Sequence, residues 1–367
     1  MGSGKWGCYD MQGFLSCAPS FKIRHRYVPS DIPPLMAHRL PNPAFLSNPT
    51  ILLVKTSSLG DVLHNLPVVS DIARHYPDAQ IDWVVEESFA ALPKLHPAVR
   101  NVIPVAVRRW RGKLLSATAW REIAAFRSTL TAQHYDIAID TQGLFKSALL
   151  MRGAQGLRCG FDRHSTREPL AASLYQRTFP VATGQHAVER NRQLAAQALG
   201  YALEGRADYG IRPPAIDRPA WLAEGHYAVL LHATSRADKL WGEPNWIALG
   251  RYLHEQNIRC VLPWGSEAEQ ARSLRLASLI PDAVAPPRLN LNEAAALLGG
   301  AQAVIGVDTG LAHLAAALGV PTVGIYTATD PALTGLYAGR YAVNLGNIDR
   351  APDTAAVIGA LQQAAAC

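Results

Sequence analysis

Short apolar runs alternate with helix-like segments from residue 51 onward, and this alternation most constrains the fold. The predicted strands are residues 51–54, 81–85, 102–107, 135–140, 227–232, 258–263, 303–307 and 322–326. The predicted helices are residues 62–75 with a bend at Pro67, 117–133, a segment opening at 146–151, 186–199, 246–255, 267–279, 291–299, a segment from 311, and the residues that follow a capping Asp353. Alternating strands and helices predict an α/β fold in which helices cover both faces of parallel sheets.

A stretch rich in glycine and proline interrupts this rhythm at residues 201–225. We interpret it as the linker between two Rossmann-like domains that face each other across a ligand cleft. Residues 51–212 are assigned to the N-terminal domain, 213–350 to the C-terminal domain and 351–367 to a C-terminal helix. Residues 1–50 are rich in Gly, Ser and Pro without a sustained period, which predicts a poorly ordered extension.

The composition fits a cytoplasmic globular protein. The chain has 367 residues, of which 49% are hydrophobic and 17% charged, enough for two domains with separate cores. No apolar run approaches the roughly 18–20 residues that span a bilayer, and no secretory signal is recognisable. The five cysteines are scattered without a C-x-x-C pair, which argues against disulfides or a zinc site and favours a reducing cytosol.

The formal net charge of +6 predicts an anionic partner. Nucleic acid, an acidic membrane surface and a phosphorylated substrate all fit, and composition does not choose among them. No nucleic-acid motif accompanies the basic residues, so a nucleic-acid partner is not expected. The sequence also lacks G-x-G-x-x-G after the first strand, a Walker motif and H-E-x-x-H, which leaves dehydrogenases, P-loop NTPases and zinc proteases without their specific signals.

The loop after the first predicted strand carries a candidate catalytic carboxylate. The sequence KTSSLGD, residues 55–61, joins the buried strand to a helix and ends at Asp61. Ligands of open α/β sheets bind at the carboxyl ends of strands, where a carboxylate can act as a general base. Asp61 could equally be an acid in the first turn of a helix, where it interacts favourably with the helix dipole.

Three strand ends in the second half offer groups suited to a nucleotide diphosphate. Thr234, Ser235 and Lys239 follow the strand at 227–232 and supply two hydroxyls and a cation. The run 307–313 joins a strand directly to a helix, whose amino terminus favours an anion; its polar members are Asp308, Thr309, Gly310 and His313. Glu269, after the strand between them, could hold ribose hydroxyls. Individually, these residues could instead be helix caps, a solvated lysine and a packed histidine.

A basic segment lies in the N-terminal half. Residues 108–113 read RRWRGK and include Arg108, Arg109 and Lys113. We interpret the segment as a contact for phosphates or an anionic membrane surface, although a solvated basic face is the simpler alternative. Lys146 and Arg167 could belong to the same surface.

Taken together, the motifs resemble those of the bacterial ADP-heptose:lipopolysaccharide heptosyltransferases, and most closely the type I members. The resemblance runs from about residue 51 to 345 and rests on the runs KTSSLGDVLHNLP, DWVVEE, VIPVAVRRWR, DTQGLFKSA, TREPLA, HAVER, HATSRADKLW, LPWG and VDTGLAHLAAAL. It implies the two-domain GT-B fold. It also implies transfer of L-glycero-D-manno-heptose from ADP-heptose to the Kdo residue of Kdo-lipid A, with inversion, at the cytoplasmic face of the inner membrane. A type II or protein-modifying enzyme with the same donor and another acceptor is the alternative, and a catalytically silent glycolipid-binding module is a more distant one.

The resemblance also implies roles for individual residues. Asp61 takes the position of the catalytic base, and no metal or other cofactor is implied. The implied donor-binding residues are Thr234, Ser235, Lys239, Glu269, Leu289, Asp308, Thr309, Gly310 and His313. The implied acceptor-binding residues are Arg108, Arg109, Lys113, Lys146, Arg167 and Arg190. Ser235 and Leu289 replace a more usual threonine and methionine, Gly112 interrupts the basic run before Lys113, and residues 1–50 have no family counterpart.

Overall fold

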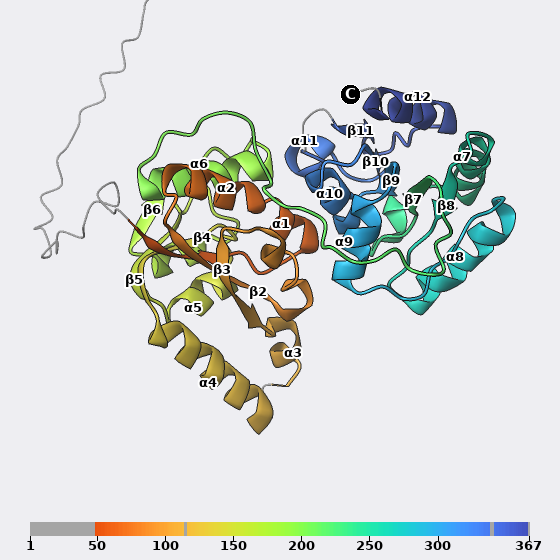
Figure 1. Ribbon diagram of the computed structural model, residues 1–367. Coiled ribbons are helices and arrows are strands. Elements are labelled where there is room, and N and C mark those ends of the chain that lie inside the picture. Colours follow the sequence, from red (N-terminus) through yellow and green to blue (C-terminus); the bar gives the residue numbers. More distant parts are fainter. Residues whose placement is uncertain (1–47, 114–115, 338–340, 366–367) are drawn as a thin grey trace, which may run out of the picture. The chain divides into compact units, whose positions relative to one another are not determined.

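The computed structural model describes residues 48–113, 116–337 and 341–365. The prediction of a poorly ordered extension falls on residues 1–50 and so lies almost entirely outside the described residues. The described chain contains two parallel sheets with helices on both faces of each (Figure 1). The predicted α/β fold with two parallel sheets is therefore confirmed.

The first sheet has the strand order β3-β2-β1-β4-β5-β6, and every neighbouring pair is parallel. Its strands are β1 (Thr50–Val54), β2 (Gln80–Glu86), β3 (Val99–Val105), β4 (His134–Asp140), β5 (Gln155–Phe161) and β6 (Arg177–Phe179). Its helices are α1 (Leu59–Leu63), α2 (Leu66–His75), α3 (Val107–Arg111), α4 (Ala117–Ala132), α5 (Phe145–Met151) and α6 (Ala187–Leu199). Short 3₁₀ turns cover Glu87–Phe89, Pro93–Leu95 and Pro169–Leu174.

The second sheet has the order β11-β10-β9-β7-β8 and is also parallel throughout. Its strands are β7 (Tyr227–Leu231), β8 (Arg259–Val261), β9 (Ala303–Val307), β10 (Thr322–Tyr326) and β11 (Ala342–Gly346). Its helices are α7 (Glu243–Glu255), α8 (Glu267–Leu279), α9 (Leu291–Gly299), α10 (Gly310–Ala317), α11 (Pro331–Thr334) and α12 (Thr354–Ala365), with a 3₁₀ turn at Ala237–Lys239.

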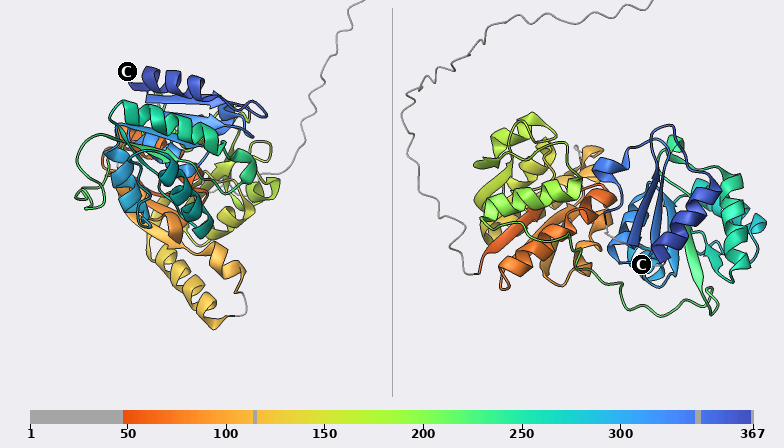
Figure 2. Two further views of the ribbon diagram at one scale, coloured as in Figure 1. Left: turned by 90° about the vertical axis from the view of Figure 1, so that its right-hand side faces the viewer. Right: turned by 90° about the horizontal axis from the view of Figure 1, so that it is seen from above.

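The strands are apolar along their whole length because each sheet is covered on both faces. In β1, Ile51 and Leu53 pack with α1, α2 and α6, whereas Leu52 and Val54 pack with α3, α4 and α5. In the second sheet, α7, α8 and α12 share one core with alternate residues of β7, and the intervening residues of β7 pack with α9 and α10. Figure 2 shows α12 lying along the second sheet.

Each sheet has a point where the strand order reverses. The reversal lies between β1 and β4 in the first sheet and between β7 and β9 in the second. The loops that leave neighbouring strands in opposite directions at such a point create a crevice, which is the usual ligand site of open α/β sheets. The Asp61 loop follows β1, and the segments that begin at His232 and Asp308 follow β7 and β9. The topology thus places these three segments at reversal points, whereas Glu269 follows β8 and the basic run 108–113 follows β3, each an edge strand of its sheet.

Several predicted elements have different bounds in the structure; the strand expected at 258–263, for example, spans only Arg259–Val261. Two of the differences lie near the candidate site. The expected helix 62–75 is divided into α1 and α2 at His64 and Asn65, two residues before the predicted bend. Pro67 causes no kink because it occupies the first turn of α2, where its missing N–H has no helical partner to lose. The expected strand 102–107 runs instead from Val99 to Val105, and Val107 begins α3.

Three strands lie where none was predicted, namely β5, β6 and β11. β5 contains Gly156 and Gly160, which lower the strand propensity of the segment. A Cβ atom at Gly160 would lie 2.3 Å from the Tyr175 ring, so close packing explains the glycine there. Residues 201–226 form no helix or strand, as expected of a linker, and the domain bounds themselves stay a prediction. Asp353 does cap the last helix, because its carboxylate accepts the backbone N–H of Ala356 at 2.8 Å.

Candidate functional site

Asp61 lies in the first turn of α1, directly after the loop that leaves β1. One carboxylate oxygen, Oδ2, accepts the backbone N–H of Ser58 at 2.9 Å, which is a helix-capping interaction. The other oxygen, Oδ1, accepts a hydrogen bond from Arg167 at 2.8 Å. The helix cap and the Arg167 contact therefore use different oxygens of one carboxylate.

Two cations control the charge of Asp61. Burial alone would raise the pKa of its carboxyl, but the charges of Lys55 and Arg167, with the hydrogen bonds from Ser58 and Arg167, lower that pKa to about 2. Asp61 is therefore ionised at neutral pH. A carboxylate held this tightly is a weak base, so its basicity rises when Arg167 is engaged by another anion.

Lys55 is a site residue that the sequence analysis did not single out. Its ammonium is buried, donates to the Thr141 carbonyl at 2.8 Å and contacts Asn191 Oδ1 at 3.4 Å. Burial lowers the pKa of Lys55 to about 8, although the Asp61 charge opposes this effect. Its position as the first residue after β1, at a reversal point of the sheet, is the signal that could have identified it.

Arg190 forms a group of three cations with Lys55 and Arg167, the two that act on Asp61. Lys55, Arg167 and Arg190 line one small cavity between the ends of β1, β4 and β5 and the start of α6. Arg190 donates to the Ser165 carbonyl and lies over the Phe161 ring, 5.0 Å from its centroid. Burial, and then the charge of Arg167, lowers the pKa of Arg190. Two cations, Lys55 and Arg167, act on the Asp61 carboxylate, and Arg190 adds a third positive charge beside Arg167. The cavity itself, at about 10 Å³, has room for about one water molecule.

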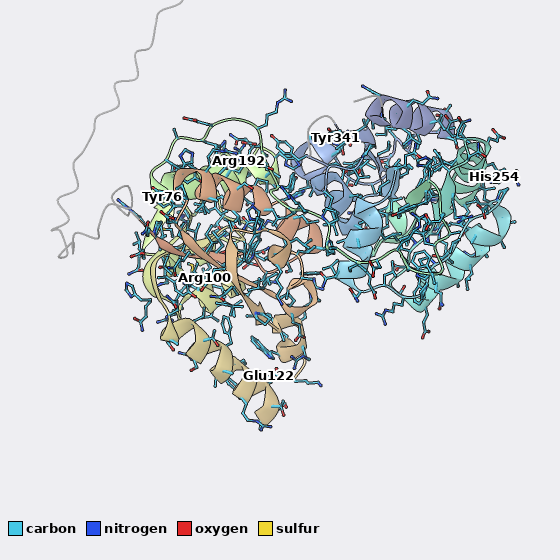
Figure 3. All side chains as sticks on the ribbon, viewed as in Figure 1. Tyr76, Arg100, Glu122, Arg192, His254 and Tyr341 are labelled. Carbon is cyan, nitrogen blue, oxygen red and sulfur yellow. The ribbon has the colours of Figure 1, made fainter. Side chains whose placement is uncertain are left out.

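The remaining predicted acceptor residues lie apart from this group. Arg109 bridges Glu87 and Glu122, with its closest atoms 3.0 Å and 2.8 Å from the two carboxylates (Glu122 is labelled in Figure 3). Arg108 lies over the Phe89 ring at 5.3 Å and its backbone N–H donates to Glu86. The described contacts of the two arginines thus run to the last residue of β2, to the turn after it and to α4, rather than to the Asp61 loop.

Lys113 and Lys146 lie on the same side of the first sheet as α3, α4 and α5. Lys113 is exposed just beyond α3, and Lys146 lies in the first turn of α5. Lys146 borders a groove of about 580 Å³ between α3, α4 and α5. The groove is lined by Val107, Trp110, Arg111, Ile123, Phe126, Arg127, Lys146, Leu149, Leu150, Arg152 and Gly153. Its floor is apolar and its charged side chains are all basic.

Asp308 is the centre of the second candidate half-site. It follows β9, and its Oδ2 accepts hydrogen bonds from Lys239 at 2.6 Å and Thr329 at 2.8 Å. Burial alone would raise the pKa of Asp308, but the contacts with His313, Lys239 and Thr329 hold it well below its usual range. The structure thus brings Lys239 and Asp308 together, as the motif positions predicted.

The amino terminus of α10 lies beside this carboxylate. Thr309 is the N-cap residue, its side chain makes no capping hydrogen bond, and the first turn carries no acidic residue. Thr234, after β7, donates its hydroxyl to the Asp308 carbonyl at 3.2 Å, and the neighbouring Ser235 is exposed. Hydroxyls, an ammonium and a helix amino terminus are a suitable environment for a phosphate group.

Gly310 and His313 of α10 meet the helix that carries Asp61. A Cβ atom at Gly310 would lie 2.4 Å from Leu59, so glycine is required for this close approach of α1 and α10. His313 Nδ1 lies 3.2 Å from Nε2 of His64, the residue that ends α1. The candidate base and the candidate anion site are thereby connected through packed residues.

Glu269 and Leu289 make contacts that are local to their own segments. Oε2 of Glu269 accepts the backbone N–H groups of Gly265 and Ser266, in a capping box at the start of α8. Leu289 lines a separate cavity of about 300 Å³ together with Trp221 and Leu222 of the linker. The described contacts connect neither residue directly with Asp308.

Residues 48–113, 116–337 and 341–365 contain no cluster of three or more His, Cys, Asp or Glu side chains arranged to hold a metal ion. Within the same ranges, every helix is too short or too polar to cross a bilayer. Cys159 and Cys260 are both buried free thiols in different sheets.

Comparisons with known proteins converge on one family. A model of glycosyltransferase family 9 (heptosyltransferase) matches residues 123–358. Lipopolysaccharide heptosyltransferase 1 of Pseudomonas aeruginosa is 50% identical over 304 residues, covering 81% of this chain and 83% of its own. The structure of the Escherichia coli heptosyltransferase WaaC with ADP has a TM-score of 0.80 at 43% identity, over 86% of this chain and 99% of its own. The same enzyme with ADP-2-deoxy-2-fluoro heptose gives a TM-score of 0.77 at 42% identity and the same coverage. The expected GT-B fold is confirmed by these matches.

Proposed function

We propose a function for this chain that follows from its family, because it belongs to glycosyltransferase family 9 (heptosyltransferase). The chain transfers L-glycero-D-manno-heptose from ADP-heptose to the Kdo residue of Kdo-lipid A. The observation that carries the proposal is the ion pair of the Asp61 carboxylate with Arg167, beside the buried Lys55, at the reversal point of a sheet. The likeness to heptosyltransferase 1 proteins and to a WaaC structure that holds an ADP-heptose analogue supports the donor and the reaction. A type II or protein-modifying enzyme with the same donor is the alternative.

Asp61 is proposed as the general base. It would remove the proton from the attacking Kdo hydroxyl while that oxygen bonds to the anomeric carbon from the face opposite ADP, so the configuration inverts. General-base help of this kind is typically worth about 10²–10⁴-fold in rate. The Kdo carboxylate would pair with Arg167, whose side chain is 42% exposed, and take over part of its charge. Binding of the acceptor would thereby raise the basicity of Asp61.

The donor would be held by the groups around Asp308. Lys239, Thr234, Ser235 and the amino terminus of α10, with Thr309 and Gly310, are assigned to the diphosphate, whose charge grows as it leaves. Asp308 and His313 are assigned to the heptose and the phosphate nearest to it. Glu269 is assigned to the ribose and Leu289 to the adenine. The diphosphate would compete with Asp308 for Lys239, so we expect this ion pair to loosen when the donor binds. No metal is needed in this scheme.

The basic residues distant from Asp61 are assigned to the outer part of the acceptor and to the membrane. Arg108, Arg109, Lys113 and Lys146 would meet phosphates of Kdo-lipid A, and Arg109 would first have to exchange partners with Glu87 and Glu122. The groove between α3, α4 and α5, with its apolar floor and basic edge, suits the anionic cytoplasmic face of the inner membrane. Co-sedimentation with vesicles tests this placement. Anionic vesicles should bind the protein more strongly than zwitterionic ones, and Arg127→Glu with Arg152→Glu should remove the difference.

One assay tests the function itself, namely ADP release from ADP-heptose with and without Kdo-lipid A. We expect release to depend on the Kdo acceptor and the product to carry one added heptose by mass spectrometry. A heptosylated acceptor distinguishes the alternatives. Transfer to heptosylated but not to Kdo-only lipid A would replace the type I assignment with type II. ADP-heptose binding without transfer to any acceptor would favour a silent binding module.

A further inference from the structure

Two buried histidines connect the helix of the proposed base with the proposed donor site. His64 ends α1, and His313 lies in the first turn of α10. Their side chains meet through His64 Nε2 and His313 Nδ1 at 3.2 Å, with the rings almost perpendicular at 89°. The residues are only 3% and 7% exposed, so water does not compete for this hydrogen bond.

The opposite edge of the His313 ring faces the donor site. His313 Nε2 lies 3.8 Å from Oδ1 of Asp308, the oxygen not used by Lys239 and Thr329. A Cβ atom at Gly60 would lie 3.4 Å from His313 Cδ2, so the first turn of α1, just before Asp61, packs against the same ring edge. The His313 ring is therefore held between the first turn of α1 and the Asp308 carboxylate.

The hydrogen bond between the histidines determines where each ring carries its proton. Burial, followed by the neighbouring His313 and His186, holds the pKa of His64 well below its usual value, so His64 is neutral and has one N–H group. If His64 donates from Nε2, His313 accepts at Nδ1 and keeps its proton on Nε2, facing the Asp308 carboxylate. Only an acceptor lone pair, at His64 Nδ1, is then left without a partner among the described residues.

The reverse arrangement is unfavourable at both ends. If a neutral His313 donated from Nδ1, its Nε2 would carry a lone pair facing the negative charge of Asp308. His64 would then carry its proton on Nδ1, which is buried and has no hydrogen-bond partner within the described ranges. An orphaned buried N–H group is costly, and a lone pair that faces a carboxylate is repelled. The contacts favour donation by His64.

We propose that His64 is a positioning residue that holds His313 in the tautomer with its proton on Nε2, so that His313 presents a hydrogen-bond donor to an oxygen of the nucleotide-sugar diphosphate or its sugar. The inference rests on the proposed function for the ligand, although the tautomer itself is a property of the free protein. Residues that orient a ligand-binding histidine typically contribute about 10–100-fold to affinity or activity in metal sites, and we expect an effect of similar size here.

Two substitutions of His64 separate positioning from packing. His64→Gln keeps an N–H donor that can reach His313 Nδ1, whereas His64→Leu fills a similar space without a donor. The matched control is His96→Leu, which removes a buried histidine bonded to Ser70 at 2.9 Å, far along the chain from both motifs. Imidazole ¹⁵N NMR reports the tautomer of His313 directly, and His313→Asn assigns its signals.

We expect His313 to carry its proton on Nε2 in the unmodified protein, in His64→Gln and in His96→Leu. In His64→Leu this preference should be lost, and KM for ADP-heptose should rise about 10–100-fold with a smaller change in kcat. A wild-type His313 protonated on Nδ1 would overturn the proposal, as would an unchanged tautomer and KM in His64→Leu. If His64→Leu does not fold, the wild-type tautomer and His64→Gln still decide. Failure of the wild type to bind or use ADP-heptose would refute the proposed function instead, because the tautomer is measured without ligand.

Discussion

Arg167 donates a hydrogen bond to the carboxylate of Asp61 at 2.8 Å. Its positive charge therefore balances the negative charge of the group proposed as the base of the reaction. The two residues are 106 positions apart in the sequence, and the order of β1, β4 and β5 in the sheet brings them together. Asp61 is consequently protected from protonation but is weakly basic. An acceptor that brings its own carboxylate to Arg167 would activate the base only when it is bound.

Removal of the Arg167 charge should change the pH dependence of turnover. Without this cation the pKa of Asp61 rises from about 2, so the carboxylate becomes protonated at a higher pH than before. In Arg167→Gln, the acidic limb of the kcat/KM profile should therefore move to higher pH, and KM for Kdo-lipid A should rise. The control is Arg163→Gln, an exposed arginine in the same loop. Identical profiles for Arg167→Gln and the control would contradict the proposed coupling.

Loss of the Asp61 carboxylate should stop transfer without loss of the donor site. Asp61→Ala removes the base, so we expect kcat to fall by about 10²–10⁴-fold, while calorimetry should show ADP-heptose affinity within a few-fold of wild type. The helix cap at Ser58 is lost as well, at a cost of about 1 kcal/mol. Asp61→Asn keeps much of the capping geometry and provides the control, because it should be as inactive as the alanine variant. Unchanged turnover in both variants would refute the assignment of the base.

The sequence was sufficient to predict the alternating α/β fold and the strand ends that carry the polar motifs. The apolar runs and the motif positions are local properties of the chain, and they placed Asp61, Lys239 and Asp308 correctly at strand ends. The pairing of Asp61 with Arg167 and the contact between His64 and His313 were not predictable, because both depend on contacts between distant segments. A pattern of residue types does not specify such contacts.

Two basic residues also show that the sequence alone does not predict which side chains a cation contacts. Arg109 was grouped with the acceptor residues because it belongs to a basic run, yet it bridges Glu87 and Glu122. Lys55 was not singled out in the sequence, yet it is buried beside the loop that leads to Asp61. Charge along the sequence does not reveal which cations are paired, buried or available to a ligand.

Lys239 should contribute to donor binding mainly through its charge. Lys239→Ala removes the ammonium proposed to meet the diphosphate and also leaves Asp308 without its 2.6 Å partner, so we expect KM for ADP-heptose to rise about 10–100-fold. Titration with ADP at increasing salt should show a weaker salt dependence in the variant. Arg236→Ala is the matched control, since Arg236 precedes Lys239 in the same segment and pairs locally with exposed Asp238. Equal effects of the two substitutions would argue against a specific phosphate contact.

The stability of the first domain should depend on one buried ion pair. Arg192 of α6 (labelled in Figure 3) binds both carboxylate oxygens of Asp71 of α2, at 2.7 and 3.1 Å, and also donates to the Glu204 carbonyl at the start of the linker. The side chains of both residues are at most 2% exposed. Removal of Arg192 leaves buried Asp71 with only the exposed Arg74, at 3.2 Å, as an ion-pair partner, and loss of one partner of a buried ion pair typically costs about 3–5 kcal/mol.

Urea denaturation of Arg192→Met should therefore show a loss of about 3–5 kcal/mol in the free energy of unfolding. Arg259→Met is the control, because Arg259 pairs with the half-exposed Asp282, and such surface pairs contribute less than about 1 kcal/mol. Combining Arg192→Met with Asp71→Leu should recover part of the loss, since no buried charge is then left unpaired. If Arg192→Met is no more destabilising than the control, the linker and the two helices are held together by apolar packing and not by this ion pair.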